Sequence, residues 1–138
     1  MLAERGEAGR ERRDDAELLA TLDRKVKWHA RILGAPAHEQ AAAVQRALAA
    51  WKHPLLARAR ESRTLWVELP LALRLADQTL AEGAFDLAFR EADGSFTVVD
   101  FKTDDPEGNP VYAAQVTLYA QAISAATGKP ARAVLLQV

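Results

Sequence analysis

The sequence predicts an α/β domain whose central mixed sheet is flanked by helices. Three observations predict this fold class: apolar residues recur at three- and four-residue steps before residue 54, they alternate with a period of two after residue 64, and a helical segment precedes the last strand. At 138 residues, 49% hydrophobic and 27% charged, the chain can bury a self-sufficient core and has a globular composition. We therefore expect one folded domain over residues 17–138.

Two helices are expected before the first strand. Residues 1–16 alternate in charge and contain few large apolar side chains, which favours a flexible N-terminal arm. An apolar stripe then runs over residues 17–33 and has His29 near its centre. A second amphipathic stretch covers about residues 37–51, and Pro54 is expected to stop it.

Three strands, a helix and a last strand should follow. The first strand is expected to place Glu68 on the face opposite to its apolar residues, which are Leu65, Val67, Leu69 and Leu71. The next two strands are expected around residues 85–90 and 96–102, and a helix over about residues 110–126. The apolar segment 131–138 is typical of a strand that is buried on both faces.

The second and third strands are expected to form a hairpin. Ala92-Asp93-Gly94 can close it as a three-residue loop, with Gly94 in the left-handed conformation. This register brings Asp86 opposite Asp100 and gathers the apolar positions on the other face. A two-residue loop would instead place Asp86 opposite Phe101 and break this sorting, so the hydrophobic pattern selects the longer loop.

Two facing carboxylates repel each other, and the surrounding residues indicate what compensates the repulsion. Lys102 shares a face with Asp100, and Glu68 adds a third carboxylate from the preceding strand. A divalent cation would balance this excess of negative charge, and oxygen ligands favour Mg²⁺, with Mn²⁺ as an alternative, over zinc or copper. A neutral imidazole at His29 could reach the same cluster.

Composition excludes several classes of protein. The absence of cysteine rules out disulfides, thiolate zinc sites, iron–sulfur clusters and cysteine nucleophiles. We find no signal sequence and no membrane span, so we expect a cytoplasmic protein. The net charge of -1 argues against tight, autonomous nucleic-acid binding through a broad basic surface.

Three motifs together resemble the PD-(D/E)xK nuclease superfamily. They are Gly83-Ala84-Phe85-Asp86, Val98-Val99-Asp100-Phe101-Lys102-Thr103 and Gln115-x-x-x-Tyr119. Within the superfamily the chain resembles the RecB/AddA branch, in which this module ends a helicase–nuclease polypeptide. Trp66-Val67-Glu68-Leu69-Pro70 is similar to the strand that precedes the hairpin in that branch. The resemblance covers about residues 25–138 and implies a restriction-endonuclease-like core.

The resemblance implies roles for individual residues. Asp86 and Asp100 would bind the metal, and Lys102 would be the catalytic lysine. A metal-ligand histidine of the family matches His29, although Lys25 stands where the family usually has glycine. The other candidates are Glu68, as a further catalytic carboxylate, and Gln115 with Tyr119, as an auxiliary DNA-binding motif beside the site.

The resemblance implies a Mg²⁺-dependent exodeoxyribonuclease that acts on DNA during recombination and repair. We expect its substrate to be single-stranded DNA. A fused or associated helicase motor would deliver the strand, and we take the chain's end at Val138 to indicate a piece of a longer protein. One rival is a non-catalytic docking domain that keeps the nuclease fold within a repair complex. The intact set of Asp86, Asp100 and Lys102 argues against it. Another alternative is a standalone nuclease or a different metal-dependent hydrolase.

Overall fold

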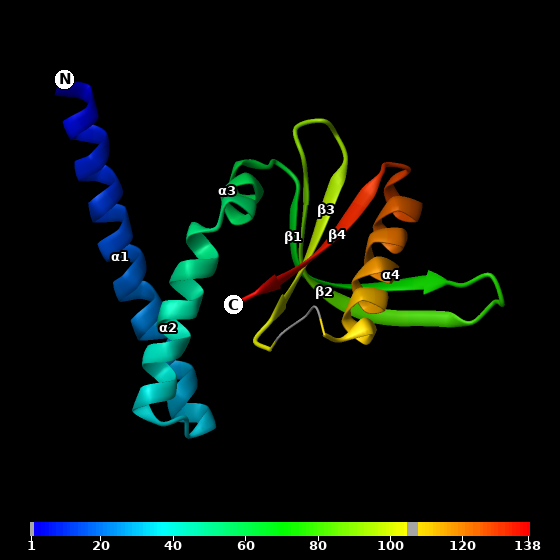
Figure 1. Ribbon diagram of the computed structural model, residues 1–138, viewed down its shortest axis with the longest axis horizontal. Coiled ribbons are helices and arrows are strands. Elements are labelled where there is room, and N and C mark those ends of the chain that lie inside the picture. Colours follow the sequence, from blue (N-terminus) through cyan, green and yellow to red (C-terminus); the bar gives the residue numbers. More distant parts are fainter. Residues whose placement is uncertain (1, 105–107) are drawn as a thin grey trace. The chain divides into compact units, whose positions relative to one another are not determined.

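A computed structural model describes residues 2–104 and 108–138, with side chains from Asp15 onward. The chain forms two compact units, residues 1–53 and residues 54–138 (Figure 1). None of the helices in the described ranges has the length and apolar character needed to cross a membrane.

The N-terminal unit is a helical hairpin of α1 (Leu2–Leu33) and α2 (Ala37–Lys52). Gly34 takes the left-handed conformation, with φ 70°, and lets the chain reverse between the two helices. An ion pair of 2.6 Å joins Lys52 Nζ of α2 to Asp15 Oδ2 of α1. Burial of Ala30 and Val44 shows that the two helices pack through small and medium apolar side chains.

Helix α1 starts at Leu2, so it includes residues 2–16, where we expected a flexible arm. This segment is rich in Glu, Arg and Ala and has no proline, a composition with high helix propensity that accounts for the helical backbone. The flexibility of the segment stays a prediction.

The C-terminal unit confirms the mixed sheet with flanking helices. Its four strands lie in the order β1-β2-β3-β4; the first two pairings are antiparallel and the pairing of β3 with β4 is parallel. Helix α4 is the crossover that a parallel pair requires. The elements are α3 (Pro54–Glu61), β1 (Leu65–Arg74), β2 (Leu80–Arg90), β3 (Phe96–Lys102), α4 (Pro110–Thr127) and β4 (Ala131–Gln137).

Apolar side chains cover both faces of the sheet around β2 and β3. Successive residues of β3 point to opposite faces, so Val98 packs under α4 and Val99 packs against α3. On the α4 side the buried cluster contains Phe85, Ala88, Phe96, Val98, Tyr119, Ala120 and Ile123. On the α3 side it contains Leu55, Ala59, Leu87, Phe89 and Val99.

The hairpin register is confirmed. Leu87 pairs with Val99 and Phe89 with Thr97, as the three-residue loop requires. The Glu91 N–H donates to the Ser95 carbonyl at 2.8 Å. Gly94 adopts φ 89°, so the loop closes with the glycine in the left-handed region.

Helix α3 is not predicted by the periodicity, which treats Pro54 only as a stop. Pro54 does end α2, but it also occupies the first turn of α3, where its missing N–H costs nothing. Two short apolar side chains of α3, Leu55 and Ala59, are buried one turn apart against the sheet.

The prediction of one continuous apolar face on β1 is wrong. Trp66 and Leu71 both pack on the α4-side cluster, although they are five residues apart, whereas Val67 is 62% exposed. The alternation breaks between them because Glu68 has a left-handed φ of 51°. Leu65 and Leu69 are also exposed.

The prediction of full burial for the last strand is wrong too. β4 lies at an end of the four-stranded sheet, and its residues are half-buried or exposed. The side chain of Arg132 is 59% exposed. An edge position gives β4 only one pairing partner among the described strands, so it cannot be enclosed as a central strand is.

Candidate active site

The candidate site begins where the pairing of β2 with β3 ends. Leu87–Val99 is the last pair of the ladder, so Asp86 and Asp100 come next in register. The carboxylate of Asp86 accepts a hydrogen bond of 2.7 Å from the Phe101 backbone N–H. A side-chain oxygen thus replaces the backbone acceptor that β2 no longer supplies, and this bond holds Asp86 against β3.

Asp100 is the buried carboxylate of the site. It is 5% exposed, and its Oδ2 atom lies 2.6 Å from Lys102 Nζ. This contact is a short ion pair, and it is the main cause of the raised pKa of Lys102. A buried carboxylate is costly unless a cation compensates it, and Lys102 supplies one positive charge here.

The pKa values of Asp86 and Lys102 are shifted because the charged groups of the site lie close together. Burial raises the pKa of Asp86, and the neighbouring Asp100 carboxyl raises it further; the bond from Phe101 and the charge of Lys102 oppose this only in part. Contact with Asp100 raises the pKa of Lys102 despite its partial burial. The site therefore favours an added positive charge, which Lys102 alone does not fully provide.

These residues fit Mg²⁺ or Mn²⁺. Both candidate ligands are carboxylates, and two carboxylates beside the single ammonium group of Lys102 leave an excess of negative charge. A Mg²⁺ ion is commonly held by one or two carboxylates, with water and substrate phosphate completing its shell. Across the described residues, no group of three or more His, Cys, Asp or Glu side chains is placed to hold an ion.

Glu68 is exposed, and among the described residues it does not form a three-carboxylate group with Asp86 and Asp100. It lies between the pairs Val67–Leu87 and Leu69–Phe85, which puts it opposite Asp86 in sequence register. Its left-handed backbone interrupts the pairing at this point. A catalytic role for Glu68 stays a prediction.

His29 belongs to the N-terminal unit and is exposed, not buried within the apolar stripe. Its ring packs edge-on against Trp28, with 4.9 Å between ring centroids. It also lines an apolar groove of about 300 Å³ between α1 and α2. Its role as a metal ligand stays a prediction.

Gln115 and Tyr119 contact each other on α4. Gln115 Nε2 donates to the Tyr119 hydroxyl at 2.7 Å, and Tyr119 is buried in the α4-side cluster. The Tyr119 ring lies over Gly83 of β2, where an added Cβ would come within 2.8 Å of the hydroxyl oxygen. This close approach explains why glycine stands three residues before Asp86.

Sequence reasoning missed two residues beside Lys102. The Tyr112 ring lies under the Lys102 ammonium group, 4.3 Å from Nζ to the ring centroid. The Tyr112 hydroxyl donates to Asp104 Oδ2 at 3.0 Å. The Gly108-Asn109 turn before Pro110, the first residue of α4, could have indicated that the first turn of α4 returns to the end of β3, but no pattern marks the aromatic contact.

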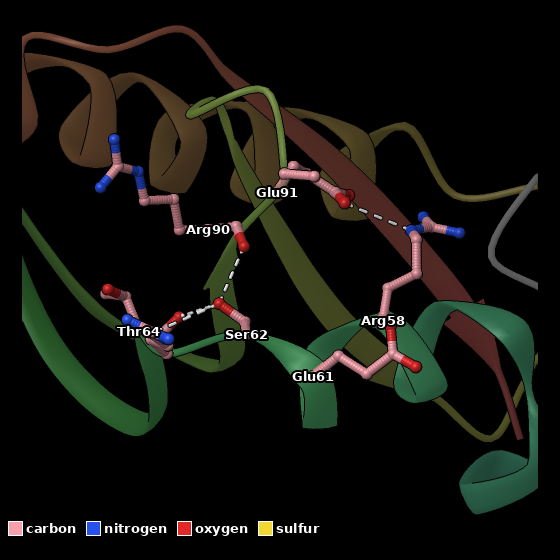
Figure 2. Close-up of a pocket in the computed structure, with 8 residues that line it drawn as sticks. Arg58, Glu61, Ser62, Thr64, Arg90 and Glu91 are labelled. Atoms are coloured by element: carbon pink, nitrogen blue, oxygen red, sulfur yellow. Dashed lines mark hydrogen bonds and ion pairs between the residues drawn. The ribbon is translucent and has the colours of Figure 1, made fainter.

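A larger pocket lies at the other end of the hairpin and is distinct from the carboxylate pair. It has a volume of about 530 Å³ and is bordered by Arg58, Ser62, Arg90 and Glu91 (Figure 2). The Ser62 hydroxyl bonds to the Arg90 carbonyl at 2.8 Å, and Arg58 pairs with Glu91 at 3.3 Å. The side chains of Arg58 and Arg90 point away from each other, so they do not converge on a common anion.

Residues 1–138 match the PD-(D/E)XK nuclease superfamily in a comparison with known protein families. No curated individual protein matches the chain.

Proposed function

Because the chain belongs to the PD-(D/E)XK nuclease superfamily, we propose that it hydrolyses phosphodiester bonds of DNA with the help of Mg²⁺. The observation that carries this proposal is buried Asp100, whose Oδ2 lies 2.6 Å from Lys102 Nζ. Asp86 supplies a second carboxylate beside it. Two carboxylates next to one ammonium group form a set suited to a hard cation and a negatively charged substrate.

Each residue has a defined part in the proposed reaction. Asp86 and Asp100 would hold Mg²⁺, which when bound polarises the scissile phosphate and lowers the pKa of a water molecule. Lys102 would orient the attacking water or stabilise the charge that develops on the phosphate. The Phe101 N–H fixes the Asp86 carboxylate, so one ligand is oriented before any ion arrives.

The finer proposal is a RecB/AddA-type module, an exodeoxyribonuclease that acts in recombination and repair. The contact of Gln115 with Tyr119 beside Gly83 supports it, because these residues match the motifs of that branch. We propose single-stranded DNA as the substrate and a fused or associated helicase as the partner that delivers it. The net charge of -1 is in keeping with such delivery. We also propose a cytoplasmic site of action, as expected from the sequence.

The test is cleavage of end-labelled single-stranded DNA in Mg²⁺ or in a chelator. Asp100→Asn should lower kcat by about a hundredfold or more, the size seen when an electrostatic contribution to catalysis is removed. Asp77→Asn is the matched control, because Asp77 is exposed in the turn between β1 and β2, and Asn can still accept the bonds from Thr79. Thermal unfolding should show that both variants fold.

Several outcomes would contradict the proposal. Equal, chelator-resistant cleavage by wild type and Asp100→Asn would show that the site is not responsible. A folded wild type that neither cleaves DNA nor takes up Mg²⁺ in titration calorimetry would favour the non-catalytic docking domain. Turnover that a DNA-delivering partner does not accelerate would favour a standalone nuclease, and phosphate release from a different ester would favour another hydrolase.

The two remaining candidates need separate variants. If His29 is a ligand, His29→Gln should raise the Mg²⁺ concentration for half-maximal activity by about tenfold or more, whereas exposed His38→Gln should not. If Glu68 is catalytic, Glu68→Gln should lower kcat, with exposed Glu61→Gln as the control. Unchanged kinetics would remove either residue from the site.

A further inference from the structure

The position of the Lys102 ammonium group is set by two partners of different kinds. One is the Asp100 carboxylate at 2.6 Å, and the other is the Tyr112 ring, whose centroid lies 4.3 Å from Nζ. The second distance is well inside the range of a cation–π interaction. A lysine side chain has a long flexible stem, so these contacts, and not the backbone, decide where the ammonium group sits.

The start of α4 places Tyr112 beside Lys102. It lies in the first turn of α4, which Asn109 caps by accepting a hydrogen bond of 3.0 Å from the Val111 N–H. Its hydroxyl donates to Asp104 Oδ2 at 3.0 Å. The place of Tyr112 in the capped first turn sets the position of the ring, and the exposed bond to Asp104 is an additional contact.

A bound metal ion would weaken the contact of Lys102 with Asp100 but not its contact with the Tyr112 ring. Asp100 Oδ2, the oxygen that Lys102 contacts, belongs to the carboxylate pair proposed to hold Mg²⁺. A cation on this carboxylate draws on the same negative charge and repels the ammonium group. The Tyr112 ring is neutral and is no ligand for a hard ion, so its contact with Lys102 does not compete in this way.

We propose that Tyr112 is a positioning residue that keeps Lys102 at the site when Asp100 is engaged by the metal. The proposal rests on the proposed nuclease function. Tyr112 acts through Lys102 by its ring, and the hydroxyl takes no part in that contact. The ring is therefore the required feature, and phenylalanine should substitute for tyrosine.

The kinetic test compares two substitutions at one position in the full chain. Tyr112→Leu removes the ring and should lower kcat about three- to tenfold, the range of a cation–π contact, with KM for single-stranded DNA unchanged. Tyr112→Phe keeps the ring and should retain kcat within about twofold. Val111→Ala is the matched control, because Val111 is the neighbouring residue of the same turn and is 68% exposed.

A second readout does not depend on activity. The ε-methylene protons of Lys102 should resonate upfield in the NMR spectrum because of the ring current of Tyr112, and Lys102→Arg identifies the signal by its loss. The shift should persist in Tyr112→Phe and disappear in Tyr112→Leu. With Mg²⁺ added, wild type should keep the shift.

The outcomes separate this inference from the proposed function. An inactive wild type that shows the ring-current shift would contradict the nuclease proposal but not the placement of Lys102. An active wild type whose Tyr112→Leu variant keeps full kcat would overturn the positioning role alone. Equal losses in Tyr112→Phe and Tyr112→Leu, or a shift that vanishes on addition of Mg²⁺, would overturn it as well.

Discussion

Gly83 and Tyr119 determine how closely β2 approaches α4 beside the site. The Tyr119 ring occupies the space that a side chain at residue 83 would need, with 2.8 Å from an added Cβ to the hydroxyl oxygen and 2.9 Å to a ring carbon. Gln115 restrains the hydroxyl through a bond of 2.7 Å, so the ring cannot turn away freely. Asp86 follows three residues later, and displacement of this part of β2 would move it.

Gly83→Ala should therefore destabilise the fold and weaken the site. Overpacking of this kind costs about 1–3 kcal/mol, and we expect a loss of that size in the free energy of unfolding measured with urea. Nuclease activity should fall at temperatures at which the variant remains folded.

The control is a double-mutant cycle with Tyr119→Leu, which removes the ring. The two changes should be strongly non-additive, because the alanine methyl group fills part of the space that the ring leaves. Additive effects would show that the strain at residue 83 does not come from Tyr119.

Single residues also show what pattern analysis can recover. The Asp86–Asp100 pairing follows from alternation and a turn, which are local properties, and its register is confirmed by the Leu87–Val99 pair. The contact of Lys102 with Tyr112 could not be predicted, since it depends on the path of the chain between β3 and α4 and on a side-chain rotamer. Neither leaves a periodic signal in the sequence.

At the scale of elements, Glu91 links α3 to the far end of the sheet. Its carboxylate accepts from the Thr97 hydroxyl at 2.7 Å and pairs with Arg58 of α3 and Arg132 of β4. Burial by itself would raise the pKa of Glu91, but the hydrogen bonds from Thr97 and Arg58 and the nearby positive charges outweigh burial and lower it. Ionised Glu91 thus contributes to the packing of three elements.

Because the pKa of Glu91 is lowered in the folded protein, its contribution to stability should decrease as the pH falls. The ionised form stabilises the folded state above the unfolded-state pKa of about 4.3, and the contribution disappears as pH falls through the lower folded-state pKa. Glu91→Gln should cost about 1.5–3 kcal/mol of unfolding free energy at pH 7, the size of hydrogen bonds to a charged group. The cost should shrink steadily below pH 4.

Urea unfolding at several pH values measures this difference. Glu61→Gln is the control, because Glu61 is an exposed residue of α3. A Glu91→Gln effect that stays constant from pH 7 to pH 3 would mean that the hydrogen-bond geometry, and not the charge, stabilises this region.

The elements differ in how well the sequence predicts them. The prediction of the hairpin is confirmed because the loop residues and the alternation of apolar residues indicate the same register. Helix α3 escapes prediction because eight residues are too few for a clear period and because Pro54 both ends one helix and begins the next. The prediction of one apolar face on β1 is wrong because one left-handed residue, Glu68, resets the alternation, and glutamate gives no sign of that conformation.

At the scale of the whole molecule, the net charge and the division into two units bear on how the chain is expected to bind DNA. The sequence predicts one folded domain, and the chain forms two compact units, with both site aspartates and Lys102 in the second. The net charge is -1, with 18 basic and 19 acidic residues. Such a chain gains little affinity for DNA from long-range attraction, so a nuclease of this kind needs another way to meet its substrate.

This reasoning predicts weak binding by the chain alone and a rescue by tethering. The dissociation constant for a single-stranded oligonucleotide should lie above about 1 µM at physiological salt, as is typical of non-specific contacts. Fusion to a sequence-neutral single-strand-binding domain should lower KM by about a hundredfold and leave kcat unchanged, because tethering raises the effective concentration of DNA without altering the chemistry. Fluorescence anisotropy and steady-state kinetics give the two quantities, and a fusion whose binding domain has lost its aromatic platform is the control. Nanomolar affinity of the unfused chain, or a fusion that raises kcat and not kcat/KM, would contradict the view that delivery limits this nuclease.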